Sequence, residues 1–249
     1  MRHISLMYHC VYNVKPEESG FQNSTAFTYK LSVNQFERQI EAISKYLDKK
    51  ELPKSTVEFT FDDGGVSSFT VIKPILEKYG FKGVFFIATK FIGTSGFITI
   101  EQIKYLAQAG HIVGSHSHTH PERMDILSLK ELEYEWMESH KILSNILNTK
   151  IETASIPNGY SSKLVIESMS MAGYKKNYTS RPTTKILHNG EFSIIGRYAI
   201  TNDMTTDYVL GIVSRKSTRL RIKCRNSFLK IAKALLGNYY LTIRKKILS

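Results

Sequence analysis

The sequence predicts an α/β fold whose parallel strands form a closed or partly closed (β/α) barrel. Short apolar segments alternate with amphipathic helical segments at regular spacing, which is typical of parallel strands covered by helices. The unusual polar residues each follow directly after a predicted strand: Asp62 and Asp63, then residues 116–120, then residues 157–160. The carboxyl ends of barrel strands meet at one mouth, so this placement favours a barrel over an open sheet.

Six segments have the composition of strands. Residues 57–61 alternate and are rich in β-forming residues, and the apolar run 83–88 is typical of a buried parallel strand. The remaining strands are predicted at residues 3–8, 111–114, 151–156 and 193–200.

Helices are predicted where a capping signal precedes apolar residues at helical spacing. Capping boxes begin at Ser32, Thr99 and Ser128, and the last of these starts a long helix that runs to about Asn148. Glycines follow the predicted helices at residues 67–79, 99–109 and 161–172. Residues 10–30 are polar and irregular.

The composition excludes several functional classes. The apolar fraction of 42% is ordinary for a folded protein, and the sequence lacks the run of about 18 apolar residues that a transmembrane helix requires. It has neither a GxGxxG motif nor a P-loop, so nucleotide binding lacks support. Cys10 and Cys224 form neither a CxxC pair nor a disulfide framework, and the N-terminal segment lacks the pattern of a secretory signal. We therefore expect a cytoplasmic protein.

The formal net charge of +12 is concentrated at the C-terminal end. Residues 208–249 contain eleven Lys and Arg residues and no Asp or Glu. This asymmetry divides the chain into a barrel at residues 1–207 and a basic helical segment at residues 208–249. Residues 226–247 carry apolar residues at helical spacing, which favours a peripheral contact with anionic lipid on the inner face of the membrane. The alternatives are a helix packed on the barrel and nucleic-acid binding, for which no recognition motif is present, so we expect no nucleic-acid partner.

Two adjacent carboxylates, Asp62 and Asp63, close a strand of apolar and β-branched residues. Taken alone, Asp-Asp-Gly is good turn chemistry and could be a solvated turn. If the two carboxylates are buried, they repel each other and need a positive partner. A cluster of imidazoles after another strand end favours the second interpretation, because imidazole and carboxylate are typical ligands of Zn²⁺ and similar ions.

The histidine cluster contains His116, His118 and His120. On an extended segment all three side chains would share one face, whereas on a helical turn only His116 and His120 would. Pro121 restricts His120 away from the α region, so the segment is not a regular helix. The spacing leaves open whether two or three of these residues bind a metal.

The chain resembles the polysaccharide deacetylases, carbohydrate esterase family 4, over roughly residues 3–200. Residues 60–64, TFDDG, match the first motif of that family, and residues 116–120, HSHTH, match its second motif. Residues 157–159, PNG, resemble the third. The resemblance implies a distorted (β/α) barrel that uses one divalent metal ion, in the first place Zn²⁺, to remove acetyl groups from sugars.

Carried over by position, the resemblance makes Asp63, His116 and His120 the metal ligands and Asp62 the general base. His118 is the variable position of the second motif, so it is not expected to bind the metal. Ser117 or Thr119 could orient the ligands. In the third motif, the resemblance assigns to Asn158 the backbone N–H that donates to the oxyanion. We expect its neighbours to contact substrate, namely Pro157, Gly159 and Tyr160.

The sequence departs from the family pattern at two places. Ser155 stands where the third motif often carries an Arg that positions the base, and the late Asp and His motifs of the general acid are not recognisable. In a branch of the family with circularly permuted motifs, an N-terminal histidine supplies the acid, and His9 resembles that arrangement. A buried structural histidine is the alternative for His9, and His188 reads as part of a turn. Arg197 could contact substrate or the base, or it could be a solvated charge.

The predicted function is a metal-dependent hydrolase that removes acetyl groups, in the first place N-acetyl groups, from a glycan or a lipid-linked saccharide. The alternatives are a catalytically inactive barrel that binds glycans and an esterase that removes O-acetyl groups from polysaccharide.

Overall fold

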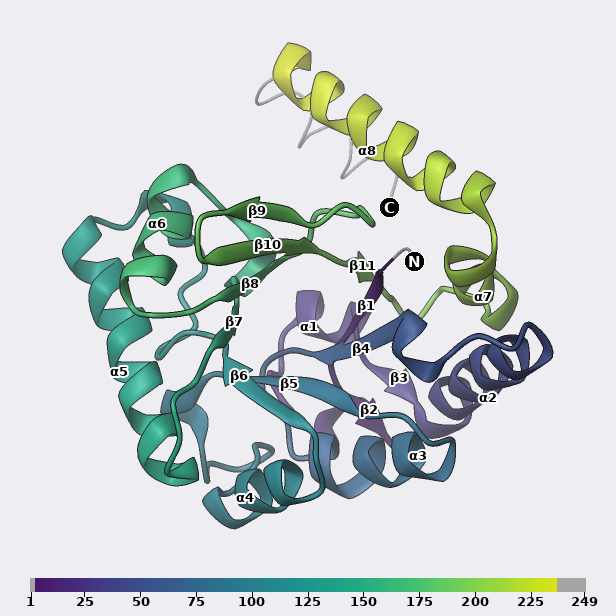
Figure 1. Cartoon of the computed structure of the whole chain (residues 1–249), viewed down its shortest axis with the longest axis horizontal. Coiled ribbons are helices and arrows are strands. Elements are labelled where there is room, and N and C mark those ends of the chain that lie inside the picture. Colours follow the sequence, from purple (N-terminus) through teal and green to yellow (C-terminus); the bar gives the residue numbers. More distant parts are fainter. Residues whose placement is uncertain (1–2, 237–249) are drawn as a thin grey trace.

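Nine strands form one curled sheet, and helices cover its outer side (Figure 1). The computed structural model describes residues 3–236, with side chains through residue 226. The strand order is β11-β1-β4-β5-β6-β7-β8-β10-β9, and every pair is parallel except β9 with β10. This is the predicted distorted (β/α) barrel.

The strands of the main sheet are short. They are β1 (Ile4–Tyr8), β4 (Val57–Phe61), β5 (Gly83–Ile87), β6 (Ile112–Ser115), β7 (Thr153–Ser155), β8 (Lys176–Thr179), β9 (Leu187–Asn189), β10 (Phe192–Gly196) and β11 (Tyr198–Ala199). A separate two-stranded sheet pairs β2 (Val11–Tyr12) with β3 (Leu31–Ser32). The predicted strand at 193–200 is in fact two strands, β10 and β11.

The α-helices are α1 (Ser24–Thr28), α2 (Val33–Lys49), α3 (Lys73–Lys78), α4 (Ile100–Gln108), α5 (Leu129–Leu147), α6 (Lys163–Met171), α7 (Thr206–Ser214) and α8 (Lys216–Leu236). A π-helical turn, Ser68–Ile72, leads into α3, and single 3-10 turns stand at Pro16–Glu18, Lys54–Thr56, Thr89–Phe91, Met124–Ile126 and Pro157–Gly159. Thr99 and Ser128 form the predicted capping boxes. Ser32 caps α2, but the Gln35 side chain donates instead to the carbonyls of Asn202 and Met204.

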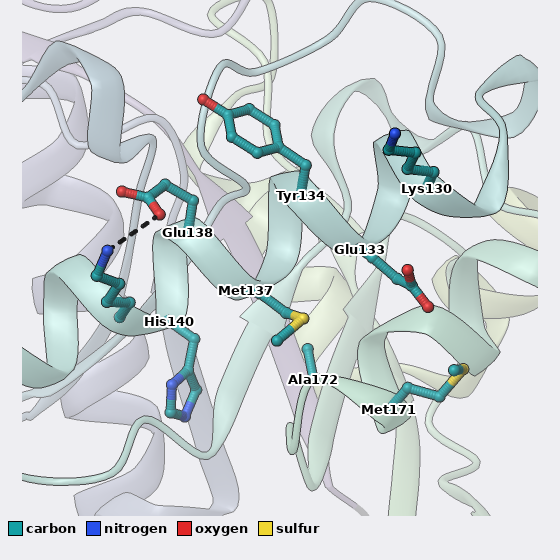
Figure 2. Close-up of a pocket in the computed structure, with 9 residues that line it drawn as sticks. Lys130, Glu133, Tyr134, Met137, Glu138, His140, Met171 and Ala172 are labelled. Atoms are coloured by element: carbon teal, nitrogen blue, oxygen red, sulfur yellow. Dashed lines mark ion pairs between the residues drawn. The ribbon is translucent and has the colours of Figure 1, made fainter.

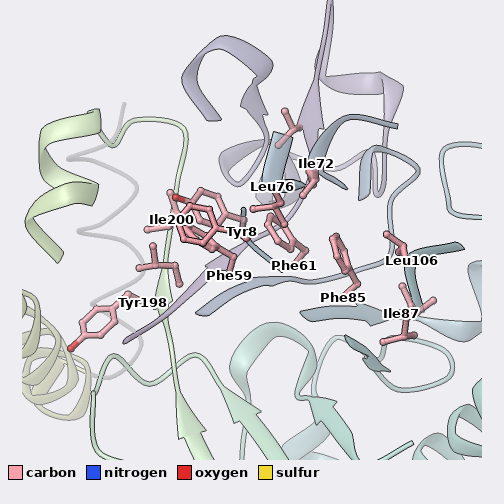
Figure 3. Close-up of a cluster of buried hydrophobic side chains, with 14 of the residues drawn as sticks. Tyr8, Phe59, Phe61, Ile72, Leu76, Phe85, Ile87, Leu106, Tyr198 and Ile200 are labelled. Carbon is pink, nitrogen blue, oxygen red and sulfur yellow. The ribbon is translucent and has the colours of Figure 1, made fainter. Parts of the chain in front are cut away.

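The two faces of the sheet differ in chemistry. Along β1, Ile4, Leu6 and Tyr8 belong to the main apolar core, which lies between the sheet and the outer helices. Figure 3 shows Tyr8 in this layer together with Phe59 and Phe61 of β4. Because side chains alternate along a strand, the residues between and after these positions point into the barrel. The interior therefore receives Thr60 and Asp62 from β4 and, after β1, His9.

A single chain segment spans the two halves of the curled sheet. β10 pairs with β8, while β11 pairs with β1 at the opposite edge, and only Arg197 separates β10 from β11. Gly196 is required at this crossing, since a Cβ atom there would lie 2.2 Å from the carbonyl oxygen of Arg181. The segment 192–199 therefore partly closes the barrel and places Arg197 between the strands β10 and β11.

The C-terminal part begins with α7, which packs against α2. Its residues Val209, Ile212 and Val213 are buried in the main core, so the packed core extends past residue 207. The division at residues 207 and 208 stays a prediction. α8 follows α7 at the outside of the barrel (Figure 1), and its Ile222 packs against the main core. Positions 237–247 of the predicted basic helix lie outside the described residues. No helix within residues 3–236 is both long and apolar enough to cross a bilayer.

Candidate active site

The polar residues that follow β4 and β6 come together at one end of the barrel. Asp63, His116 and His120 each offer one ligand atom, and these three atoms lie within 4.8 Å of one another. Asp63 and His116 are buried, and His120 is half-buried. The main chain holds this end in place, because the Asp62 N–H donates to the Tyr8 carbonyl and the His116 N–H donates to the Ile87 carbonyl.

The spacing of the three side chains fits a divalent metal ion. Asp63 Oδ1 lies 3.5 Å from His116 Nε2 and 3.3 Å from His120 Nε2. Ligand atoms at about 2.0–2.1 Å from a tetrahedral Zn²⁺ are separated by about 3.3 Å, so these distances match a tetrahedron edge. His116 Nδ1 lies 3.0 Å from the Ser155 carbonyl, to which it must donate, so Nε2, which faces Asp63, is the ring nitrogen that can bind a metal.

His118 turns away from this group. Its Nδ1 is 2.9 Å from the Thr89 hydroxyl, and its ring packs edge-on against Tyr134 of α5. The set of possible metal ligands within residues 3–226 contains Asp63, His116 and His120 but not His118. The geometry therefore agrees with two histidine ligands rather than three.

Backbone strain is concentrated at this site. Asp63, Ser117, His120 and Asn158 have φ angles of 76°, 62°, 58° and 54°, and they are four of the six non-glycine residues with positive φ in the described chain. Such conformations cost on the order of 1 kcal/mol or more each and persist where surrounding contacts enforce them. The ligand-bearing segments are therefore held in shapes that they would not adopt alone.

Asp62 is held by Arg197 rather than by the metal-ligand group. Both side chains are almost fully buried, and the guanidinium donates to Oδ1 at 2.6 Å and to Oδ2 at 2.8 Å. Burial raises the pKa of Asp62, but the charge and hydrogen bonds of Arg197, together with the nearby His116 and His9, outweigh burial, and the pKa is lowered from its usual value. Asp62 is therefore an ionised carboxylate within 3.9 Å of His116 Nε2.

Of the three alternatives for Arg197, the structure shows the contact with Asp62, the proposed base, and it does not agree with a substrate contact or a solvated charge. Its side chain is fully buried, and it also donates to the Ser155 hydroxyl at 2.7 Å and the Thr60 hydroxyl at 3.1 Å. Ser155, which stands where the family motif often has an Arg, is small enough to accept this guanidinium from another strand. Arg197 thus takes the place of the missing Arg as the partner of Asp62.

The third-motif loop follows β7 and approaches the second motif. The Asn158 side-chain amide donates to the Pro121 carbonyl at 3.4 Å, directly after His120. Gly159 has a φ of 72°, and a Cβ atom there would lie 2.1 Å from the Ser180 hydroxyl, so glycine is required. Asn158 and Tyr160 are exposed and Gly159 is half-buried.

Pro157 does not suit the substrate contact predicted for it, because it is the buried residue of this loop. Tyr160 presents an exposed ring, over which the Arg123 guanidinium lies at 4.5 Å from the centroid.

The comparison with protein families now decides the assignment. Residues 49–176, slightly more than half of the chain, match the family model described as polysaccharide deacetylase. The chain belongs to the polysaccharide deacetylase family. The matched region contains both carboxylates, all three histidines and the third-motif loop, but neither His9 nor Arg197.

Three relatives illustrate the likeness. YxkH of Bacillus subtilis (strain 168), whose name places it among the polysaccharide deacetylases, is 29% identical over 147 residues, which is 59% of this chain and 52% of the relative. The chain thus matches about half the length of that protein. The deacetylase PplD of Streptococcus pyogenes, solved in complex with acetate, is 24% identical, with a TM-score of 0.67 over 86% of this chain and 99% of that one.

The third relative is BC0361, a polysaccharide deacetylase from Bacillus cereus. It is 17% identical and has a TM-score of 0.70 over 86% of this chain and 69% of that one. At these identities the two solved structures show a shared fold, the barrel of the polysaccharide deacetylases.

His9 lies at the same end of the barrel as the family motifs. It follows β1 at an inward position, and its ring is tilted against Tyr29 at 4.5 Å. Burial lowers the pKa of His9, while the nearby carboxylates of Asp63 and Asp62 oppose that shift. Its Nδ1 is buried and has no hydrogen-bond partner among the described residues. His188 lies in β9 instead, exposed and bonded to Ser193.

A loop that the sequence marks only as irregular contributes to this site. Phe21 packs at 4.7 Å from the His120 ring and at 4.8 Å from Phe91. The buried Lys30 holds the loop, because its Nζ donates to the Pro16 carbonyl at 2.8 Å. Neither contact has a local signal in the sequence, since Phe21 stands about 100 positions before His120.

A surface cavity of about 540 Å³ lies apart from this site, between α5 and α6 (Figure 2). Its lining includes Tyr134, Met137, His140 and Met171, and Glu138 at its edge pairs with Lys141 at 3.8 Å. It contains none of the family's motif residues.

Proposed function

We propose that this protein is a metal-dependent hydrolase that removes acetyl groups, in the first place N-acetyl groups, from a glycan or a lipid-linked saccharide. The observation that carries the proposal is that the adjacent residues Asp62 and Asp63 have different partners. Asp63 faces His116 and His120, whereas Asp62 is bound by Arg197 and stands beside that group. A barrel that only binds glycans would gain nothing from a second buried carboxylate with its own counter-charge.

The chain can provide each proton transfer that the reaction requires. Asp63, His116 and His120 would hold a divalent ion such as Zn²⁺, which would supply Lewis-acid chemistry for the acetyl carbonyl and for water. Asp62 accepts the proton that the attacking water loses. The backbone N–H of Asn158 donates to the developing oxyanion, and the left-handed conformation of Asn158 sets the direction of that loop. His9 donates a proton to the leaving amine.

Metal analysis combined with acetate release from N-acetylglucosamine oligomers tests the proposal. We expect about one divalent ion per chain and acetate release that a chelator abolishes. Asp62→Asn should keep the ion and lose turnover by about 10²-fold or more, because it removes the base and not a ligand. Glu138→Gln, on the outer face of α5, is the control and should resemble wild type.

The same assay distinguishes the alternatives. Release from O-acetylated sugars only would identify an O-acetyl esterase. A metal-loaded protein that binds glycans but releases no acetate from either substrate would identify an inactive binding barrel and contradict the proposal.

The basic segment at residues 208–249 supports a separate proposal, a peripheral contact with anionic lipid on the inner face of the membrane. Lys216, Arg221, Lys223 and Arg225 of α8 are exposed, and the segment contains no acidic residue to neutralise them. Leu220 is 55% exposed on the same helix. Clustered basic residues near a surface each contribute about 1 kcal/mol of attraction to anionic lipid.

Sedimentation with vesicles tests this contact. Wild type should bind phosphatidylglycerol vesicles at low salt and bind phosphatidylcholine vesicles weakly. Replacing the four exposed basic residues of α8 with Gln should reduce binding, whereas replacing Lys49, Lys50, Lys104 and Lys150 with Gln should not. Equal loss in both variants would contradict a specific role for α8.

A further inference from the structure

The loop that carries two of the proposed metal ligands needs external support. His116 and His120 stand at its ends, and Ser117 and His120 both have left-handed backbone conformations. On one side, the main-chain N–H groups of Thr89 and Lys90 donate to the carbonyls of Ser117 and His118. The loop's own N–H groups at positions 118 and 119 point to the other side, toward α5.

Glu135 of α5 accepts both of these N–H groups. Its Oε2 lies 2.9 Å from the His118 nitrogen and 2.8 Å from the Thr119 nitrogen, and its Oε1 accepts from the Thr119 hydroxyl at 2.5 Å. Glu135 is only 5% exposed. Burying a carboxylate is costly unless hydrogen bonds compensate, and here all three of its bonds come from residues between the two ligands.

A second contact between α5 and the loop reinforces the first. The Ser139 hydroxyl, one turn after Glu135, bonds the Ser115 hydroxyl at 2.7 Å. Ser115 in turn accepts from the Ser117 N–H, and the Ser117 hydroxyl accepts from the His120 N–H, each at 3.1 Å. The loop is thus held between residues 89–90 and α5, and Glu135 supplies the only charged contact among these bonds.

From this arrangement we infer that Glu135 is a positioning residue for the metal site: its carboxylate fixes the backbone between His116 and His120 and thereby sets the affinity for the ion. The inference rests on the proposed metal-dependent function. Glu135 is not one of the three possible ligands and bonds only residues 118 and 119 of the loop, so it acts through the loop. Partners of metal ligands typically change metal affinity by about 10–100-fold when removed.

Zn²⁺ binding to the metal-free full-length protein, measured by calorimetry or chelator competition, tests this inference. Glu135→Ala should bind Zn²⁺ about 10–100-fold more weakly than wild type. Glu135→Gln should lose less, because its amide oxygen can still accept both N–H groups. Glu138→Gln, three residues along the same helix, should bind as wild type does.

Thr119 provides a milder variant in case Glu135→Ala does not fold. Thr119→Val keeps the shape and removes one donor, so its affinity for Zn²⁺ should fall severalfold, and Thr119→Ser should restore it. Wild-type affinity in a folded Glu135→Ala protein, or in Thr119→Val, would overturn the inference. If wild type itself binds no ion, the proposed function fails instead.

Discussion

Arg197 and Asp62 lie 135 positions apart in the chain and meet inside the barrel through two hydrogen bonds of 2.6 and 2.8 Å. The guanidinium donates two roughly parallel hydrogen bonds to the carboxylate, and this geometry makes such pairs strong and specific. The pair fixes the orientation of the proposed base, and it also supplies the positive charge that two adjacent buried carboxylates require.

Replacing Arg197 should therefore impair turnover more than metal binding. In Arg197→Ala the buried Asp62 loses its counter-charge, and we expect turnover to fall by about 10²-fold or more. We also expect the free energy of unfolding to drop by about 3–5 kcal/mol, the usual consequence of leaving one buried charge unpaired. Arg197→Lys should recover part of the stability and little of the turnover, because a lysine cannot bind both oxygens. Acetate release, metal content and urea denaturation measure the three effects, and near-normal turnover in Arg197→Ala would disprove the role.

From the three proposed metal ligands, we expect variants within the histidine cluster to differ sharply in metal binding. Changing Asp63, His116 or His120 to Ala should abolish stoichiometric metal binding, since each is proposed to supply one of three ligands. His118→Ala should keep the ion, because His118 bonds Thr89 and packs on Tyr134 instead. Metal content after dialysis measures both outcomes. A protein that loses its ion on His118→Ala would require a different ligand set.

His9 should contribute to the rate without holding the ion. We expect His9→Ala to retain metal and to lose about 10²–10⁴-fold in turnover, the range of a positioned acid. The pKa of His9 is lowered, chiefly by burial, so protonation of its ring is shifted to lower pH. The ratio of wild-type to variant rates should accordingly grow as pH falls. His188→Ala, at the exposed β9 hairpin, is the matched control. A ratio that stays constant with pH would argue against proton donation by His9.

His111 should make the folded protein sensitive to acid. Its side chain is buried, its Nδ1 accepts from the Gly83 N–H at 2.9 Å, and burial lowers its pKa to about 4. The unfolded chain, with a pKa of about 6.5, binds more protons between those values, so stability should fall as pH drops from about 6.5 to about 4. The loss amounts to at most roughly 3 kcal/mol. In His111→Asn, whose amide oxygen can accept the same bond, urea denaturation at several pH values should show a flatter dependence. An unchanged slope would show that other groups cause the acid sensitivity.

The family motifs can be predicted from local sequence patterns. The residues that contact these motifs come from distant segments, and local patterns do not predict them. Residues 60–64 and 116–120 each form a continuous signal, and the strands that precede them are predicted from local composition and alternation. β8 was not predicted, because its sequence, Lys-Asn-Tyr-Thr, lacks an apolar run. The contact of Arg197 with Asp62 depends on β10 and β11 pairing with opposite edges of the sheet, which no local spacing encodes. Glu135 and Phe21 were missed for the same reason.

The crossing of residues 192–199 also sets a temporal order during synthesis. A nascent chain that has left the ribosome as far as residue 190 already holds the three proposed ligands, the proposed base and the third-motif loop. It still lacks the guanidinium that neutralises Asp62 and the strand that joins the two sheet edges. The contact between Arg197 and Asp62 therefore cannot form until the chain has been made past residue 197, and a chain released earlier would contain every recognised family motif but not the counter-charge of Asp62.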